Sequence, residues 1–350
     1  MKRTKSKRLS TKVGRIMIVL IALILTTFWV WAQPTQKGEP AKPYKLTWIS
    51  AFPKTHSVTV GFQKGFVEKV TELTQGRLVF EHKGGPETFP FPDTGKAIQN
   101  KVVDMGFSAV GNYEQMAPGV GGAILREISF EEERKPGGAF DYLVSLCVPG
   151  GLRYLGRGLP CNDLSFFSIF SNKKIEKPED FKGYRMGTTT STSLAVTAWG
   201  GTAINLSGPS DYYTSMERGT TDGVCSTTAE QIVASGTYQV TKYAPQQGFF
   251  DGSLSVLMNL KVWNSLPPDL QQVLIQAMAR YEKYSADLHQ SVIEKAYKRM
   301  SDSGVQVYKF SPEMGKWLRD KAYDATWADQ LKRFPNQAPR LRALLSPARK

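Results

Sequence analysis

Residues 171–226 read SNKKIEKPEDFKGYRMGTTTSTSLAVTAWGGTAINLSGPSDYYTSMERGTTDGVCS, and the order of elements in this stretch decides the fold. A proline-bearing turn at 177–181 leads through Lys182-Gly183 into a short apolar segment that carries Arg185. The pattern then predicts a helix at 191–199, a strand at 202–206, a helix around 212–216 and a glycine-bounded turn at 219–223. Strands that alternate with helices indicate an α/β fold with a largely parallel sheet.

The chain before this stretch repeats the alternation. Strands are predicted at 44–49, 77–82, 104–110 and 164–171, and helices at 58–73 and 93–100. In parallel sheets, ligands bind beyond the carboxyl ends of the strands. Three loops therefore become candidates for ligand contact, at 50–56, 84–92 and 111–117.

The longest predicted helix starts at Leu266-Pro267-Pro268-Asp269 and keeps apolar residues at helical spacing for about thirty residues, to Met300. A soluble helix of this length is typical of a segment that bridges two lobes. A strand at 253–259 precedes it and is expected to return to the first lobe. A strand at 305–310 and a helix at 312–332 follow, and the Pro- and Arg-rich tail after Phe334 is expected to be poorly ordered.

These motifs together resemble the solute-binding proteins of TRAP transporters, dicarboxylate (DctP) type. The likeness runs from about Tyr44 to Met300 and rests on the turn and arginine of 177–185, on Asp222-Gly223 and on the helix start at 263–271. His56, the segment 76–78 and the segment 97–105 answer to further positions of that pattern. The resemblance implies a two-lobed α/β periplasmic binding protein with a long helix bridging both lobes. The expected division is 44–163 plus 252–290 for lobe I, 164–251 plus 291–335 for lobe II, and 336–350 for the tail.

The N-terminus has the pattern of an export signal. The formal net charge is +14, and seven of those charges lie in the first fifteen residues, directly before the apolar block 16–32. Small residues at Val30 and Ala32 favour cleavage after Ala32, although the block also comes near the length of a membrane anchor. Either way the body, which follows a linker at 33–43, is expected in the periplasm. The remaining charge is spread out and no nucleic-acid motif accompanies it, so no nucleic-acid partner is expected.

Motifs for catalysis and cofactors are missing from the sequence. It contains no GxSxG, no GxxxxGK[ST], no GxGxxG and no HExxH, and no Cys/His cluster with zinc spacing. No enzyme activity, cofactor or metal is therefore expected. The acidic run 131–133 is interpreted as a solvated helix end. Cys147 and Cys161 either form a disulfide across the Pro149-Gly150-Gly151 loop or remain free thiols.

Arg185 is the first candidate ligand-binding residue. A guanidinium grips a carboxylate through two parallel hydrogen bonds, and the resemblance implies that an arginine at this place clamps the ligand carboxylate. The alternative is a structural ion pair with an acidic residue of lobe II. The resemblance also points to Ser226 in place of a family asparagine and to Phe167 in place of a second arginine. The remaining candidates are Thr188 and Thr189 after Arg185, and Trp48, Glu87 and Tyr113 on or beside the lobe I loops.

The predicted function is that of an extracytoplasmic receptor that captures a small organic acid between its lobes and delivers it to the membrane permease subunits of a TRAP transporter. The missing second arginine favours a monocarboxylate with an apolar part over a C4-dicarboxylate. A receptor for an ABC importer or a sensor kinase remains an alternative. A periplasmic enzyme that uses Glu87 or His56 as a base is the other.

Overall fold

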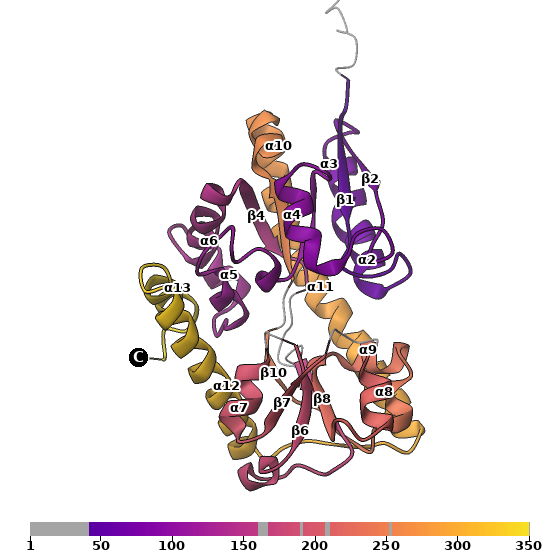
Figure 1. Ribbon diagram of the computed structural model, residues 1–350. Helices are drawn as coiled ribbons and strands as arrows, with labels where there is room; N and C mark the ends of the chain where they lie inside the picture. Colours follow the sequence, from indigo (N-terminus) through magenta and orange to yellow (C-terminus); the bar gives the residue numbers. More distant parts are fainter. Residues whose placement is uncertain (1–41, 160–166, 190–191, 207–210, 252–253, 350) are drawn as a thin grey trace, which may run out of the picture. The chain divides into compact units, whose positions relative to one another are not determined.

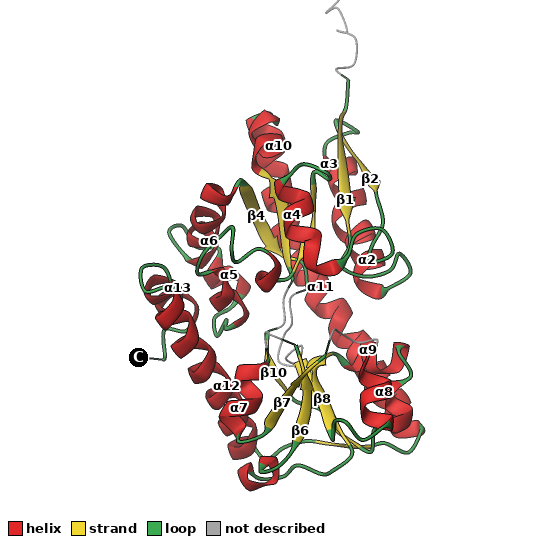
Figure 2. Ribbon diagram, in the orientation of Figure 1, coloured by secondary structure: helices red, strands yellow, loops and turns green. Residues whose placement is uncertain are grey.

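Two β-sheets, each at the centre of one lobe, organise the chain (Figure 1). The structure is a computed structural model that describes residues 42–159, 167–189, 192–206, 211–251 and 254–349. Helices flank the strands of both sheets (Figure 2). The expected α/β architecture with two lobes is confirmed.

The strands are β1 (Tyr44–Ile49), β2 (Leu78–His82), β3 (Met105–Ser108), β4 (Leu152–Arg157), β5 (Phe167–Ser171), β6 (Arg185–Thr188), β7 (Thr202–Asn205), β8 (Gly223–Thr227), β9 (Tyr243–Pro245), β10 (Gly248–Phe250), β11 (Ser255–Asn259) and β12 (Gln306–Tyr308). The α-helices are α2 (Ser57–Phe62), α3 (Glu68–Leu73), α4 (Thr94–Gln99), α5 (Phe130–Glu133), α6 (Ala139–Cys147), α7 (Ser193–Trp199), α8 (Tyr212–Glu217), α9 (Ala229–Ala234), α10 (Leu260–Ser265), α11 (Pro268–Asp302), α12 (Pro312–Arg333) and α13 (Ala338–Leu345). A π-helical stretch at Gln63–Val67 joins α2 to α3.

Lobe I is built on a sheet with the strand order β2-β1-β3-β11-β4. β1 pairs in parallel with both β2 and β3, whereas β11 pairs antiparallel to β3 and β4. Ser255 of β11 lies opposite both Ser108 and Arg157, so β3 and β4 end at the same edge of the sheet. The carboxyl ends of β1, β3 and β4 therefore share one edge. The sequence predicted this for the parallel strands at 44–49 and 104–110, whereas β4 was not predicted as a strand.

Lobe II is built on a sheet with the order β12-β9-β5-β8-β6-β7, and β10 also pairs with β5. β6 runs parallel to both β7 and β8. Thr188 at the end of β6 lies opposite Asn205 at the end of β7. β5 runs antiparallel to β8, with Ser168 opposite Thr227. The carboxyl ends of β6, β7 and β8 thus lie together at one edge.

Helix α11 bridges the two lobes over 35 residues. Its first part, which includes Leu270 and Tyr281, is buried in the core that also holds Trp48 of lobe I. Its last part, which includes Tyr297, is buried in the core that also holds Phe170 of lobe II. Proline at the first helical position is compatible with the helix start because that N–H needs no intrahelical acceptor.

Helices α12 and α13 form a second connection along one side of the molecule (Figure 1). α12 contacts α7 and β10 of lobe II, while α13 contacts α6 and the turn at 120–124 of lobe I. The expectation of a poorly ordered tail was wrong, because Leu341 and Leu345 are fully buried. The Trp327 indole of α12 donates a hydrogen bond to the Ser346 hydroxyl at 3.2 Å, which secures the end of α13.

Two further details concern the cysteines and the apolar character of the helices. Cys147 and Cys225 are free, buried thiols, so the structure forms no bridge to Cys147, while Cys161 lies outside the described residues. Burial raises the pKa of Cys147 to about 12, which keeps this thiol protonated. Within the described ranges, no helix combines the length and apolar character required to cross a bilayer.

The penultimate residue generates the first prediction. The Arg349 guanidinium bonds to Glu127 of lobe I at 2.9 Å and to Asp320 and Asp324 of α12 at 2.6 and 2.9 Å. Arg349→Ala is expected to lower the free energy of unfolding by about 1–2 kcal/mol, because charge-assisted bonds between two segments are lost. Chemical denaturation measures this change. Lys332→Ala on the exposed side of α12 is the control, and equal destabilisation by both variants would contradict the prediction.

Candidate functional site

A cluster of hydroxyl groups lies at the carboxyl edge of lobe II. The Thr189 backbone N–H donates to Ser226 Oγ at 2.8 Å, and the Ser226 hydroxyl also contacts the Thr192 hydroxyl. Thr188 Oγ1 donates to Asn205 Oδ1 at 3.2 Å. The structure thus brings together three residues that the sequence singled out separately: Thr188, Thr189 and Ser226. These bonds fix the positions of short polar groups where three parallel strands end.

Arg185 lies at the other end of β6. Its side chain is 46% exposed, and its Nε and Nη2 donate to the two carboxylate oxygens of Asp222 at 3.2 and 3.0 Å. The Arg185 backbone N–H also donates to Asp222, at 2.9 Å. Because a strand advances about 3.3 Å per residue, Arg185 lies roughly 10 Å along the strand from Thr188. The structure therefore shows the ion pair that was the alternative to a ligand clamp.

Two of the three lobe I candidates are core residues. Trp48 is 1% exposed and stacks on His82 with 4.1 Å between ring centroids. Tyr113 is fully buried, and its hydroxyl bonds to Ser255 at 2.6 Å. The expectation that these two side chains line the cleft is corrected. Trp48 on β1 and Tyr113, which follows the turn at Val110–Asn112, are both buried in the cores of lobe I.

Glu87 differs from these two because it is exposed in the 84–92 loop. Its Oε1 accepts the Gly85 backbone N–H at 2.8 Å. Backbone hydrogen bonds from its own loop, which favour the charged form, lower the pKa of Glu87. The carboxylate therefore stabilises its own loop and stays ionised at neutral pH.

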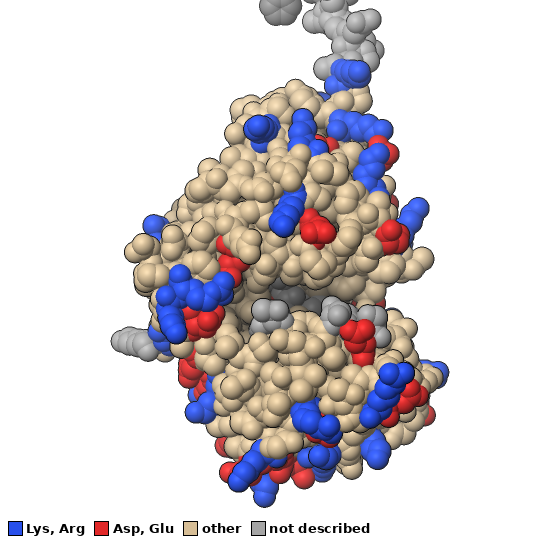
Figure 3. All heavy atoms as spheres, in the orientation of Figure 1, with Lys and Arg blue, Asp and Glu red and all other residues tan. Residues whose placement is uncertain are grey.

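The carboxyl edges of the two lobes face each other. Ser57, which follows the loop after β1, donates through its hydroxyl to Glu230 Oε2 of α9 at 2.8 Å. α9 itself follows directly after β8, with Thr228 as its N-cap. Phe167 at the start of β5 packs against apolar residues of the two largest cores. The surface is hollowed between the upper and lower lobes, and on this face few Lys or Arg side chains line the hollow (Figure 3).

A buried network of charged groups lies where the chain passes between the lobes. Arg157 at the end of β4 is 1% exposed, and its Nε donates to Glu133 at 2.7 Å. Asp251, between β10 and β11, accepts from Arg126 at 2.9 Å and lies 3.6 Å from Arg157. Burial alone would lower the pKa of Arg157, but Glu133 and Asp251 outweigh it and raise that pKa. The acidic run is thus not wholly solvated, because Glu133 is buried in this network.

The same network reaches helix α11 through Glu282. Glu282 accepts from Arg134 Nε at 2.6 Å and from the Arg157 backbone N–H at 2.7 Å. Gly156 makes this approach possible, because a Cβ there would lie 2.4 Å from Arg134 Nη2 and 2.5 Å from Glu282 Oε1. Its φ of +153° is also a value that favours glycine. Lobe I is therefore joined to the middle of α11 by paired charges.

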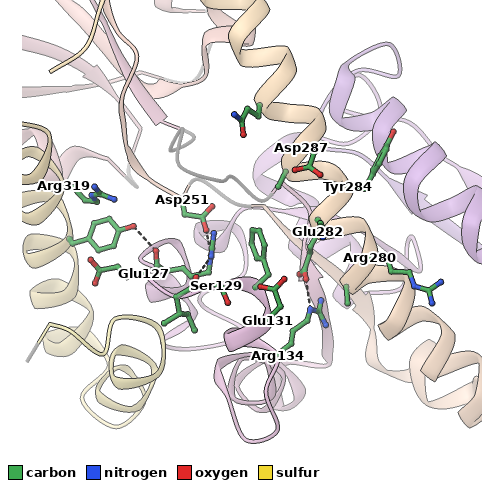
Figure 4. A pocket seen from close by; sticks show the side chains of 18 residues that line it. Glu127, Ser129, Glu131, Arg134, Asp251, Arg280, Glu282, Tyr284, Asp287 and Arg319 are labelled. Carbon is green, nitrogen blue, oxygen red and sulfur yellow. Dashed lines mark hydrogen bonds and ion pairs between the residues drawn. The ribbon is translucent and has the colours of Figure 1, made fainter. Parts of the chain in front are cut away.

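A pocket of about 1270 Å³ lies over this network, between α5, α11 and α12 (Figure 4). Its lining combines both signs of charge and includes Arg126, Arg134, Asp251, Glu282 and Arg319. The buried charges among them already bind one another: Arg126 with Asp251, and Arg134 with Glu282. This pocket is larger than a small ligand needs, and its lining includes none of the hydroxyl groups of Thr188, Thr189 and Ser226. We therefore place the candidate site at the two carboxyl edges.

Comparison with known proteins now identifies the family. Residues 157–332, half of the chain, match the family described as bacterial extracellular solute-binding protein, family 7 (DctP). The chain belongs to this family. The matched region contains every described strand of the lobe II sheet, together with α11 and most of α12.

Two curated relatives match part of this chain. An uncharacterised protein of Haemophilus influenzae is 30% identical over 142 residues, 39% of this chain and 41% of the relative. The C4-dicarboxylate-binding periplasmic protein DctP of Rhodobacter capsulatus is 26% identical over 148 residues, 42% of this chain and 44% of the relative. The match therefore spans less than half the length of either curated relative.

The fold of the family 7 chain is that of TRAP periplasmic solute-binding proteins. One such structure, from Desulfovibrio salexigens with bound orotic acid, superimposes with a TM-score of 0.73 at 21% identity. The superposition covers 87% of this chain and 98% of the other. The likeness extends over both lobes, beyond the region that the family assignment covers.

The sequence did not single out several residues that the structure brings together between the lobes. Ser57 and Glu230 are 173 positions apart, and Arg157 meets residues from three other segments. No local spacing rule connects such positions. The place of Arg185 at the amino edge of the sheet could have been inferred, because it is the first residue of a strand that runs parallel to its neighbours.

Arg157 generates a prediction about the buried network. Arg157→Gln is expected to lower the free energy of unfolding by about 3–5 kcal/mol, because Glu133 and Asp251 would remain buried without their shared partner. Urea denaturation measures this change. Arg153→Gln on the same strand, where the side chain packs over Trp263, is the control. The prediction fails if the Arg157 variant is no less stable than this control.

His289 generates a prediction about pH. Burial lowers the pKa of His289 to about 4, and its Nδ1 lies 3.1 Å from Ser285 Oγ. Between pH 6.5 and 4 the unfolded chain then binds more protons than the folded chain, so this residue makes stability fall as pH falls. The loss is about 3 kcal/mol at most, since one pKa unit corresponds to about 1.4 kcal/mol.

The measurement is the free energy of unfolding of the wild type and of His289→Gln from pH 4 to 7. The difference between the two should change across this window, because carboxylates elsewhere contribute equally to both proteins. A difference that is constant with pH would contradict the neutral, buried state of His289.

Proposed function

We propose that this family 7 protein is the extracytoplasmic receptor of a TRAP-type secondary transporter. It captures a small organic acid between its lobes and delivers the acid to membrane permease subunits. No covalent chemistry is involved. The single observation that carries the proposal is the facing of the two carboxyl edges, bridged by the bond between Ser57 and Glu230. In α/β sheets that edge is where ligands bind.

The ligand class rests on similar proteins. Their structures hold β-D-galacturonate in the Sulfitobacter protein, orotic acid in the Desulfovibrio salexigens protein and pyroglutamic acid in a Bordetella pertussis receptor. Each of these ligands is a small acid that also carries polar groups able to hydrogen-bond. A small carboxylate with further polar groups is therefore the proposed ligand of this chain.

In lobe II, we assign ligand contact to Thr188, Thr189 and Ser226, with Phe167 as an apolar contact at the lobe boundary. In lobe I, we assign it to Glu87, whose second carboxylate oxygen is available to a ligand hydroxyl. Arg185 is left out, because its Nε and Nη2 already donate to both carboxylate oxygens of Asp222 in a bidentate pair. This arrangement favours a ligand held in lobe II by hydroxyl groups and backbone N–H groups.

The periplasm is the proposed location, in line with the name of the Rhodobacter capsulatus relative and with the signal-like start of the sequence. The permease pair is proposed from the family alone. Binding of the acid would raise the fraction of molecules with closed lobes without creating a new conformation, provided that the closed form binds the acid more tightly than the open form.

A thermal-shift screen of the chain from Gln33 tests the proposal. The probes are galacturonate, orotate, pyroglutamate and succinate. A ligand present at about a hundred times its Kd should add roughly 2.7 kcal/mol to the free energy of unfolding. Stabilisation by at least one acid is expected. If none of these acids and no broader set of organic acids stabilises the protein, the proposed ligand class is wrong.

Three variants then locate the site. Ser226→Ala should weaken binding about five- to tenfold, because one hydrogen-bonding group is lost and the Thr189 turn is released. Arg185→Ala should leave the Kd unchanged. Ser215→Ala, which removes another buried serine hydroxyl of lobe II, is the matched control. Loss of binding in Arg185→Ala with full binding in Ser226→Ala would instead establish Arg185 as the carboxylate ligand.

A further inference from the structure

The bond that joins the two carboxyl edges is part of a larger contact. Glu230 of α9 accepts from the Ser57 hydroxyl at 2.8 Å through Oε2, and its Oε1 lies 3.8 Å from His56 Nε2. The helices that carry these groups, α2 and α9, both pack against α11. Glu230 belongs to lobe II, and Ser57 and His56 belong to lobe I. The contact therefore holds the lobes together beside the bridging helix.

The two ring nitrogens of His56 have different surroundings. It is the N-cap of α2, and its Nδ1 accepts the Val58 backbone N–H at 3.3 Å. An Nδ1 that accepts a hydrogen bond carries no proton, so the neutral ring has its proton on Nε2, which faces Glu230. The ring also stacks on Phe52, with 4.2 Å between centroids and 10° between planes. This geometry fits a neutral imidazole.

His289 of α11 completes the contact from the side of the bridging helix. His56, Glu230 and His289 line one cavity of about 10 Å³, which is about the size of a single water molecule's probe sphere. The Nε2 atoms of both histidines are buried in it without a protein hydrogen-bond partner. Glu230 and His289 are the titratable groups that face His56 from the neighbouring helices. No group of three His, Cys, Asp or Glu in the described ranges has a metal-binding arrangement.

We propose that Glu230, Ser57 and His56 form a proton-sensitive latch, which holds the lobes together while His56 is neutral and opens when His56 takes a second proton. The latch goes beyond the proposed function. It is a property of the two lobes and does not depend on which acid is bound. Its use in ligand release rests on the receptor function.

The geometry explains why a proton opens the latch. A second proton can bind only at Nδ1, where it removes the acceptor of the Val58 N–H and leaves the end of α2 uncapped. It also places a full charge beside His289 in a cavity too small to hydrate it. Separation of the lobes exposes the ring to water and removes the cost of burying this charge.

The pKa shifts of the two histidines also favour separated lobes at low pH. Burial lowers the pKa of His56, and the nearby Glu230 offsets this only in part. Burial also lowers the pKa of His289. A state in which these rings are exposed binds protons more readily, so falling pH shifts the population toward separated lobes.

Distance measurements between the lobes test the latch without any ligand. Spin labels are attached to Glu68→Cys on α3 and Thr197→Cys on α7, two exposed positions in different lobes. Cys161→Ser leaves one label per lobe, since Cys147 and Cys225 are buried. Between pH 7.5 and 5.0, the ratio of longer to shorter distances should rise about threefold or more. A distribution that does not change with pH would overturn the proposal.

Two variants and one control test which residues cause the pH-dependent change in the distance between the lobes. Glu230→Gln should show the longer distances already at pH 7.5. His56→Asn should reduce the pH response by at least half, because asparagine can still cap α2 but does not titrate, which leaves only the contribution of His289. Glu217→Gln, an exposed carboxylate of the same lobe, should behave as the wild type. A full pH response in His56→Asn would show that another group is responsible and would overturn the assignment.

Nuclear magnetic resonance of the unsubstituted protein provides a test that does not depend on any variant folding. The ¹⁵N shifts of His56 should report the Nε2–H tautomer at pH 7.5. Its titration midpoint should lie below 6.5. An imidazolium at pH 7.5, or a proton on Nδ1 of the neutral ring, would refute the latch. No acid is added in any of these experiments. The latch can therefore be refuted while the thermal-shift screen supports the receptor function, and the latch can be supported while the screen finds no ligand.

Discussion

Helix α11 has to bury apolar side chains in two different cores while it carries polar groups through the region between them. Leu270 and Tyr281 are buried with lobe I, and Tyr297 is buried with lobe II. Between these positions, Glu282 and His289 are both 3% exposed. A buried carboxylate is tolerated only where charges and hydrogen bonds replace water. Arg134 and the Arg157 backbone supply these, and they fix the place where lobe I sits on the helix.

This requirement also limits how the lobes can move. Asp251, in the chain segment that returns from lobe II to lobe I, is held by Arg126 and lies near Arg157. Breaking such a buried network leaves charges without partners and costs several kcal/mol. The network of Arg126, Arg157 and Asp251 is therefore expected to stay intact when the lobes move. By contrast, the contact of Glu230 with Ser57 and His56 involves partly exposed groups and is far easier to break. Motion between the lobes is expected to break the contact of Glu230 with Ser57 and His56 and to preserve the buried charge network.

Much of the fold followed from local patterns, whereas much of the site did not. Helix α11 was predictable because its apolar positions repeat at helical spacing, and β1 was predictable because polar and apolar residues alternate. Trp48 and Tyr113 were misjudged because loop proximity says little about which way a side chain points. The residues that join the lobes could not be found, since Glu230 and Ser57 meet only after both sheets have formed. For Arg185 the sequence left a ligand clamp and an ion pair open, and the position of this residue at the amino end of β6 places it beside Asp222.

The energetics of the two contacts bear on how a receptor of this kind can release what it binds. A ligand shifts the equilibrium between separated and closed lobes only by its differential affinity for the two states. Shifting a population from 1:99 to 99:1 takes about 5.5 kcal/mol, so any contact that closes the lobes by itself must be weaker than this. The bond from Ser57 to Glu230, with a neutral His56 beside it, is in the range of an ordinary hydrogen bond, about 1 kcal/mol. A contact of this strength can favour the closed lobes without trapping the ligand. Protonation of His56 is then enough to favour the separated lobes instead.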